Sequence, residues 1–270
     1  MSDSLSPLIR AVEAADSSTL LTEAVQNLAA ARQTGAIPTL IAALSYNNPG
    51  AAVAAVEGLI HLGEPAVPAL IELLDLHNYT ARSWAIRALA GIGDPRGLVT
   101  LLGVATADFS LSVRRAAARG LGMMKWHWFP ADLLEVAQEE VLEALLFVAQ
   151  QDDEWVVRYA AVVGLQSLTG AVDETYSEWR SRIHSQFEYM ANHDQSAAVR
   201  ARVWMAQQQI QAGAIVPPVE DRSPLSSTDW QVILEGLYSR KGQERLVLAE
   251  GDPRRYHGLA VSIAQKTENS

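Results

Sequence analysis

The chain has 270 residues, of which 49% are hydrophobic and 19% charged, a composition typical of a globular protein with one large core or two modest cores. It contains no cysteine, which excludes disulfides, a thiol nucleophile and thiolate metal sites, and favours a reducing cytoplasm. A formal net charge of −10 argues against nonspecific binding to nucleic acid, and the absence of a long apolar run predicts no membrane span.

A unit of thirty residues recurs along the chain. The stretch AIPTLIAALSYNNPGAAVAAVEGLIHLGE is followed by AVPALIELLDLHNYTARSWAIRALAGIGD, so that Pro38 and Pro68 occupy matching positions. The second half of the unit returns as SLSVRRAAARGLGMM, EWVVRYAAVVGLQSL and SAAVRARVWMAQQQ, the last two at wider spacing. An earlier partial unit, LIRAVEAADSSTLLTEAVQNLAAARQTG, is predicted to cap the N-terminal end. Such a period indicates a solenoid of stacked repeats.

Each recurring half is predicted to be a helix that begins behind a polar capping residue, with Asp153 as an alternative to the weak cap Glu154. Apolar residues follow at helical spacing, and glycines such as Gly63, Gly91 and Gly93 are expected to end the helices. We therefore predict an all-α fold, an α-solenoid of about five to six helix pairs. The predicted caps and the residues three positions later are Asn48 with Ala51, Asn78 with Ala81, Ser110 with Val113, Glu154 with Val157, and Ser196 with Val199.

The repeat pattern ends near Ala212. The stretch AIVPPVEDRSPLSSTDW is rich in proline, serine and aspartate and is predicted to be a linker, and Ser226 to Asp229 is a plausible cap for one more helix. We therefore divide the chain into an α-solenoid over residues 1–212, and a linker with a C-terminal extension of unassigned role over residues 213–270.

The repeats resemble a known family at NNPGAAVAAVEGLI, ARSWAIRALAGIGDPRGL, SVRRAAARGLG and EWVVRYAAVVGL. They look like the HEAT-like repeats of phycobilisome bilin lyases, nearest to the F-type members of the heterodimeric E/F lyases that serve the phycocyanin α chain. The resemblance spans roughly residues 6 to 212. A related isomerising branch carries a His-Cys motif where this chain has His127 followed by Trp128, so isomerase activity is not expected.

The resemblance implies a cytoplasmic lyase subunit that forms a heterodimer with an E-type partner. Such a pair attaches, or sometimes removes, an open-chain tetrapyrrole at a cysteine of a phycobiliprotein α chain. Phycocyanobilin or a related bilin is then a substrate, and no permanently bound cofactor is expected. The alternative is a HEAT scaffold or bilin chaperone without catalytic activity, including a factor for phycobilisome degradation or chromophore detachment.

No catalytic motif stands out by spacing, and the six histidines form no ligand-spaced pairs, so no metal site is predicted. Between residues 81 and 126 there are seven positive and two negative residues, whereas the rest of the chain has fourteen positive and twenty-nine negative residues. Four arginines in this chain recur at one repeat position, which favours a structural role in bonding to the neighbouring repeat. They are Arg82, Arg114, Arg158 and Arg200.

Arg87, Arg115 and Arg119 do not recur in this regular way and are predicted to lie on the concave face of the second helices. Trp84 and Tyr159 lie near them, although core packing is an alternative for Trp84. Arginine side chains beside aromatic surface are suited to a flat conjugated ligand with two propionates. We therefore predict that these five residues bind the bilin, with plain solvent-facing charge as the alternative for each arginine.

The stretch MMKWHWFP follows this basic region. One interpretation places Trp126 and Trp128 against a pyrrole ring and makes His127 the catalytic residue, as a proton donor to the bilin. The other interpretation is packing, with Trp126 and Phe129 closing a hydrophobic gap beneath the longer spacer.

Overall fold

The computed structural model describes residues 5–74, 78–173, 175–213 and 223–249. These residues form α-helices and short 3₁₀ helices and contain no strand, which confirms the predicted all-α class. The α-helices are α1 (Leu5–Glu13), α2 (Ser18–Ala30), α3 (Ile37–Ala43), α4 (Pro49–Leu62), α5 (Val67–Leu74), α6 (Tyr79–Ile92), α7 (Leu98–Ala107), α8 (Leu111–Gly122), α9 (Ala131–Gln151), α10 (Trp155–Ala171), α11 (Ser177–His193), α12 (Ala197–Gln211) and α13 (Ser227–Ala249). The 3₁₀ helices are η1 (Thr34–Ala36), η2 (Glu64–Ala66), η3 (Pro95–Gly97) and η4 (Trp126–Trp128).

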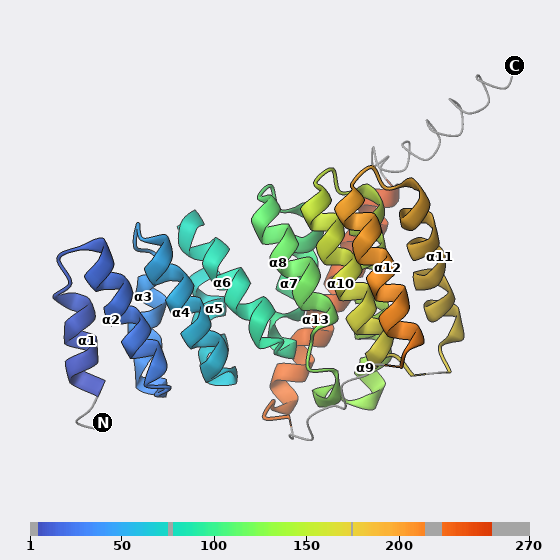
Figure 1. The fold of residues 1–270 in the computed structure, drawn as a ribbon. Coiled ribbons are helices and arrows are strands. Elements are labelled where there is room, and N and C mark those ends of the chain that lie inside the picture. Colours follow the sequence, from blue (N-terminus) through green and yellow to red (C-terminus); the bar gives the residue numbers. More distant parts are fainter. Residues whose placement is uncertain (1–4, 75–77, 174, 214–222, 250–270) are drawn as a thin grey trace, which may run out of the picture. The chain divides into compact units, whose positions relative to one another are not determined.

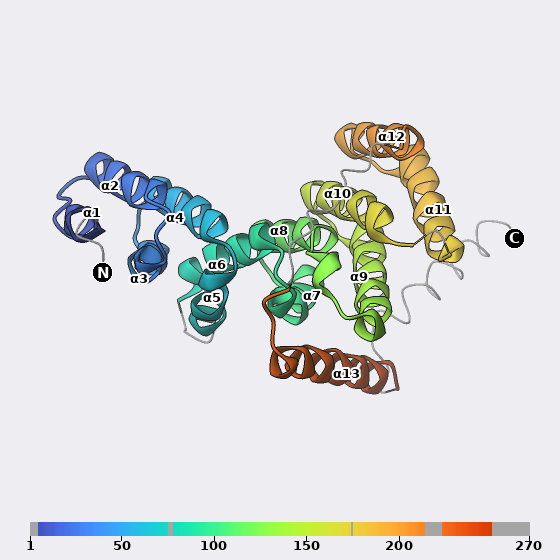
Figure 2. The ribbon, with the colours of Figure 1, turned by 90° about the horizontal axis from the view of Figure 1, so that it is seen from below.

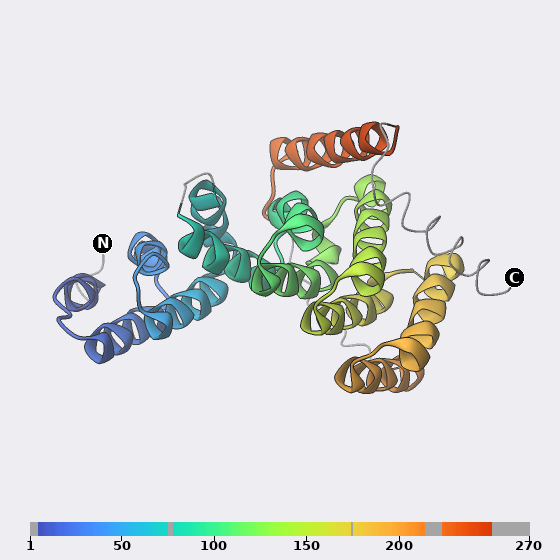
Figure 3. The ribbon, with the colours of Figure 1, turned by 90° about the horizontal axis from the view of Figure 1, so that it is seen from above.

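The chain divides into two compact units, residues 1–224 and residues 225–270. In the first unit, consecutive helices pair from α1–α2 to α11–α12, so the predicted solenoid of helix pairs is confirmed. The second helices of the pairs, from α2 to α12, lie side by side in one layer and each contacts the next (Figure 1). Figure 2 shows that this row follows the inner side of a curve, with α3, α5, α7 and α9 on its outer side, and Figure 3 shows the same two layers from the opposite direction.

The predicted caps are correct in two repeats and need correction in three. The side chains of Asn48 and Asn78 accept hydrogen bonds from the amides of Ala51 and Ala81, each at 3.1 Å. Ser110, Glu154 and Ser196 occupy the cap positions without a side-chain capping bond. In these repeats an aspartate two residues earlier accepts from the backbone amide of the cap residue, at 2.8 to 3.0 Å. These aspartates are Asp108, Asp152 and Asp194, not the predicted Asp153.

Two of the predicted glycine stops are confirmed. Gly63 and Gly93 follow α4 and α6 with φ angles of 72° and 68°, where a side chain would strain the backbone. Gly91 instead lies inside α6, where a Cβ atom would come within 2.4 Å of Ile60. It allows α6 to pack closely on α4 and does not end the helix.

The closest helix packing joins α8 to α10. A Cβ atom at Gly122 would lie 2.0 Å from the carbonyl oxygen of Gly164, and one at Gly164 would lie 2.4 Å from the carbonyl oxygen of Ala118. The two backbones therefore touch directly. The wider spacing of the later repeats is taken up by their longer first helices, 21 residues in α9 and 17 in α11.

Three of the four recurring arginines form the predicted ladder between repeats. Arg82 bonds to Asp108 at 2.6 Å, while Arg114 and Arg158 each hold the aspartate of the next repeat through two hydrogen bonds. Arg200 donates to the carbonyl oxygen of Asp194 at 2.7 Å, at the end of α11. The ladder thus ties the starts of α6, α8 and α10 to the end of the next repeat's first helix, whereas Arg200 bonds within its own repeat.

In the second unit, α13 begins directly after Ser226, as predicted. The hydroxyl of Ser226 donates to the Asp229 carboxylate at 2.7 Å and accepts from the Asp229 amide at 3.3 Å. Most of the predicted linker, including Val216-Pro217-Pro218, lies outside the described residues, so the division at residue 212 stays a prediction. No single helix of the described chain is long and apolar enough to cross a membrane. Helix α4 and the segment Glu64–Leu74 reach that length and apolar character only together, and they are bent by 119° relative to each other.

Candidate functional site

The predicted arginines lie on neighbouring second helices of the inner layer. Arg87 belongs to α6, and Arg115 and Arg119 belong to α8, one helical turn apart. All three side chains are exposed, and none forms a hydrogen bond or ion pair with another residue that the structure describes. The three arginines therefore leave positive charge available to a ligand.

Arg87 and Arg115 are close enough to influence each other electrostatically. The pKa of Arg87 is lowered, mainly because the guanidinium is partly buried and to a smaller extent because Arg115 is positively charged. The Arg87 guanidinium lies 4.9 Å from the ring centre of Trp84, a cation–π distance. Trp84 itself is half-buried and packs against the N-terminal core, so it contributes to both the core and the edge of this cluster.

The charge of the inner layer differs in sign from the charge of the whole chain. Helices α6, α8, α10 and α12 carry eight arginines and no aspartate or glutamate. By contrast, α9 on the outer side carries five carboxylates and no basic residue. Four of the eight are the recurring arginines, and the other four have no carboxylate partner among the described residues: Arg87, Arg115, Arg119 and Arg202. Segregated charge of this kind concentrates anions on one face.

Arg202 is a candidate site residue that the sequence analysis missed. Its guanidinium lies 5.9 Å from the ring centre of Tyr159, which is itself exposed on α10. The Arg202 side chain is buried, which lowers its pKa, and it donates to Gln166 while its Nη1 atom has no hydrogen-bond partner. The sequence did contain a signal for Arg202, because this arginine does not recur: the corresponding positions of the other second helices hold alanine or tryptophan.

The aromatic residues of MMKWHWFP require a correction. Trp126 and Trp128 are only 7% and 5% exposed, so neither indole offers a face to a ligand. Trp126 donates to the carbonyl oxygen of Gly122 and packs against Phe129 at 5.2 Å between ring centres, as the packing interpretation predicts. The Lys125 ammonium covers the ring of Trp128 at 3.9 Å.

His127 differs from its neighbours because its side chain is exposed. It lies on η4 and meets Trp128 edge to face at 6.1 Å. The backbone of this segment is held by a 2.8 Å hydrogen bond from the Lys125 amide to the carbonyl oxygen of Gly93. Its role as a proton donor stays a prediction, because exposure alone does not bring the imidazole to a particular atom of the bilin.

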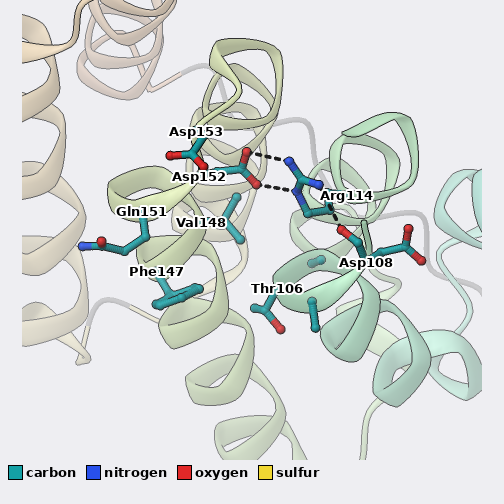
Figure 4. A pocket seen from close by; sticks show the side chains of 10 residues that line it. Thr106, Asp108, Arg114, Phe147, Val148, Gln151, Asp152 and Asp153 are labelled. Carbon is teal, nitrogen blue, oxygen red and sulfur yellow. Dashed lines mark hydrogen bonds and ion pairs between the residues drawn. The ribbon is translucent and has the colours of Figure 1, made fainter. Parts of the chain in front are cut away.

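A hollow of about 280 Å³ lies beside the ladder (Figure 4) and contains none of the predicted site residues. Arg114 crosses it to Asp152, and Asp108 and Asp153 also line it, so carboxylates outnumber the one arginine. This hollow does not suit a ligand with carboxylate groups. No group of three histidine, aspartate or glutamate side chains in the described ranges is arranged to hold a metal ion.

Comparisons with known proteins identify the repeats and the family. A family model described as HEAT repeats matches residues 67–166, and one described as PBS lyase HEAT-like repeat matches residues 51–75. A phycocyanobilin lyase subunit beta from Pseudanabaena tenuis is 63% identical over 98% of this chain and 99% of its own length. A phycobilisome maturation protein from Synechococcus elongatus is 50% identical over 76% of this chain and 98% of its own length.

The fold agrees with a solved relative. A chain in the complex of CpcE and CpcF of phycocyanin lyase from Nostoc superposes with a TM-score of 0.58 and 47% sequence identity, covering 65% of this chain and 99% of that chain. Together with the nearly full-length match to the Pseudanabaena protein, this shows that the chain belongs to the family of phycocyanobilin lyase beta subunits.

Proposed function

We propose that this chain is the F-type, or beta, subunit of a heterodimeric phycocyanobilin lyase, and that the inner layer of second helices binds the bilin. The family supports the reaction, because relatives are named as phycocyanobilin lyase subunits and one was solved in a complex of CpcE and CpcF. The chain acts with an E-type partner and takes the bilin as a substrate.

The observation that carries the assignment of the site is the pair Arg87 and Arg115, two cations without carboxylate partners on the adjacent helices α6 and α8, neither of which carries an acidic residue. A bilin carries two propionate groups, and guanidinium groups bind carboxylates through paired hydrogen bonds. Arg119 extends the same column by one turn. Trp84 beside Arg87, and Tyr159 on α10, supply aromatic surface for the conjugated rings.

The reaction joins the bilin to a cysteine that this chain does not contain. Addition of the thiol across a carbon–carbon double bond of the bilin breaks the S–H bond and the π bond, forms one C–S bond and one C–H bond, and releases nothing, because the proton that the thiol loses replaces the one given to carbon. The proton must be delivered to the bilin, and exposed His127 is the proposed donor. The arginines hold the propionates, and the acceptor protein provides the sulfur.

The site is tested by measuring the binding of phycocyanobilin to the complex of this chain with the E-type partner, with visible absorbance as the readout. Replacing Arg115 or Arg87 with glutamine is expected to weaken binding about tenfold or more, because each removes a charge-assisted hydrogen bond. Arg182→Gln is the matched control, since Arg182 lies on α11 and pairs with Glu143 on α9. Equal affinity in all three variants would place the bilin elsewhere.

A further inference from the structure

A row of exposed apolar side chains borders the basic face. Tyr79, Leu111 and Trp155 are each the first residue of a second helix, in α6, α8 and α10. Phe109 precedes α8 and stacks on Tyr79 with 4.7 Å between ring centres. These four residues, which we name the apolar rim, are between 40% and 79% exposed. Large apolar side chains at one repeat position in three successive repeats mark an interaction surface.

The apolar rim is confined to α6 and α8, which carry Arg87, Arg115 and Arg119, and to the next second helix, α10. The matching positions are Pro49 in α4 and Ala197 in α12, so the row of large side chains ends at both sides. Four residues further along α8 from Leu111 is Arg115, and the same step along α10 leads from Trp155 to Tyr159. Four residues advance a helix by about 6 Å, so the rim lies one turn from the proposed bilin site.

The spacing of the rim indicates the kind of partner. Neighbouring helices in a packed layer lie about 8–10 Å apart, which sets the distance between successive rim residues. A helix lying across the layer presents residues i and i+7 on one face about 10 Å apart. Its apolar side chains therefore match the rim, and a carboxylate flanking them matches Arg115, one turn further along α8 from Leu111.

We propose that the apolar rim binds a helical segment of the acceptor phycobiliprotein α chain and brings its cysteine to the bilin. This inference rests on the proposed function. Because the chain has no cysteine, the thiol must come from another protein whose surface reaches within about a helical turn of the bilin. A partner seated permanently on the rim would block that approach, so the rim is assigned to the transient acceptor and not to the E-type partner.

The double variant Phe109→Ser with Trp155→Ser tests this proposal in the complex with the E-type partner. Both side chains are exposed, so the fold tolerates their loss. The assay is covalent transfer of bilin to apo-phycocyanin α chain. We expect the double variant to raise the apparent KM for the acceptor about tenfold or more, and to leave bilin affinity and the size of the heterodimer unchanged. Trp204→Ser is the matched control, because Trp204 is 62% exposed on α12, outside the rim.

Three results would overturn the proposal: an unchanged KM for the acceptor, a heterodimer that dissociates on gel filtration, or a loss of bilin affinity without change in the KM for the acceptor. The second would assign the rim to the E-type partner, and the third would make it part of the bilin site. Failure of the proposed bilin site is distinguishable, because Arg115→Gln would then leave bilin affinity unchanged while the rim variant still raised the KM for the acceptor.

Discussion

Arg114 donates two hydrogen bonds to the carboxylate of Asp152, 38 residues further along the chain, at 2.7 and 3.0 Å. The same carboxylate accepts from the amide of Glu154, and so it joins two repeats and starts a helix at once. Arg158 and Asp194 repeat this arrangement in the next repeat, with hydrogen bonds of 2.7 and 2.9 Å. The bond to Asp152 raises the pKa of Arg114 despite partial burial, which is the effect expected of a strong ion pair.

Replacement of Asp152 by asparagine is expected to lower the free energy of unfolding by about 2–3 kcal/mol, because it leaves a largely buried guanidinium without its counterion. Urea denaturation followed by circular dichroism measures the change. The control is Glu143→Gln, which breaks the exposed ion pair of Glu143 with Arg182 and should cost no more than about 0.5 kcal/mol. Equal costs for the two variants would contradict a structural role for the ladder.

The ladder also predicts a dependence on pH at Asp194. Burial raises the pKa of this carboxyl, but hydrogen bonds from Arg158 and from the Ser196 amide outweigh burial, and the pKa lies below its ordinary value. A group with a lowered folded-state pKa stabilises the protein above its unfolded pKa of about 4, and this contribution is lost as the pH falls through the folded-state pKa. The difference in unfolding free energy between the wild type and Asp194→Asn should therefore shrink between pH 7 and pH 3, as measured by denaturation at each pH. A constant difference would rule out the charged carboxylate as its source.

The contact between α8 and α10 predicts that Gly122→Ala is severely destabilising. The new methyl group would meet the backbone of Gly164, which cannot rotate away, so the helices must separate. We expect a loss of about 3 kcal/mol or more of unfolding free energy, or failure to fold. Gly103→Ala in α7 is the control, since its Cβ atom would meet nothing within 4 Å and alanine is favoured in helices. The melting temperatures of the two variants should move in opposite directions.

Repetition made the fold predictable from the sequence, whereas the site was only partly predictable. The ladder arginines were separable from the others because Arg82, Arg114 and Arg158 return at one position, and recurrence indicates a bond between repeats. The capping aspartates were missed because each acts two residues before the expected cap, through a bond that a spacing rule does not include.

The packing of Trp126 was one of two predicted alternatives, whereas the burial of Trp128 was not predicted, because its position depends on a turn. Helical periodicity does not extend through η4, whose conformation follows from the tertiary bond between the Lys125 amide and Gly93. Arg202 was missed for a different reason, since its burial depends on packing between α10 and α12. Properties set by contacts between repeats are not encoded in the pattern of one repeat.

Within MMKWHWFP, replacement of Trp126 and of His127 should have opposite consequences. Trp126→Ala removes a buried indole that packs on Phe129, so the free energy of unfolding should fall by about 3–5 kcal/mol. His127→Ala removes an exposed side chain and should change that free energy by about 0.5 kcal/mol or less. If His127 delivers the proton to the bilin, its loss should slow covalent transfer about a hundredfold or more while bilin affinity is retained.

Single-turnover transfer to apo-phycocyanin α chain, with bilin prebound to the heterodimer, separates this chemical step from binding. The rate of this step is expected to fall in His127→Ala, while the amount of bilin bound before the reaction is unchanged. His127→Gln serves as the control, because its amide can donate a hydrogen bond but cannot release a proton at neutral pH. A glutamine variant that transfers bilin at the wild-type rate would show that His127 holds the substrate and does not donate the proton.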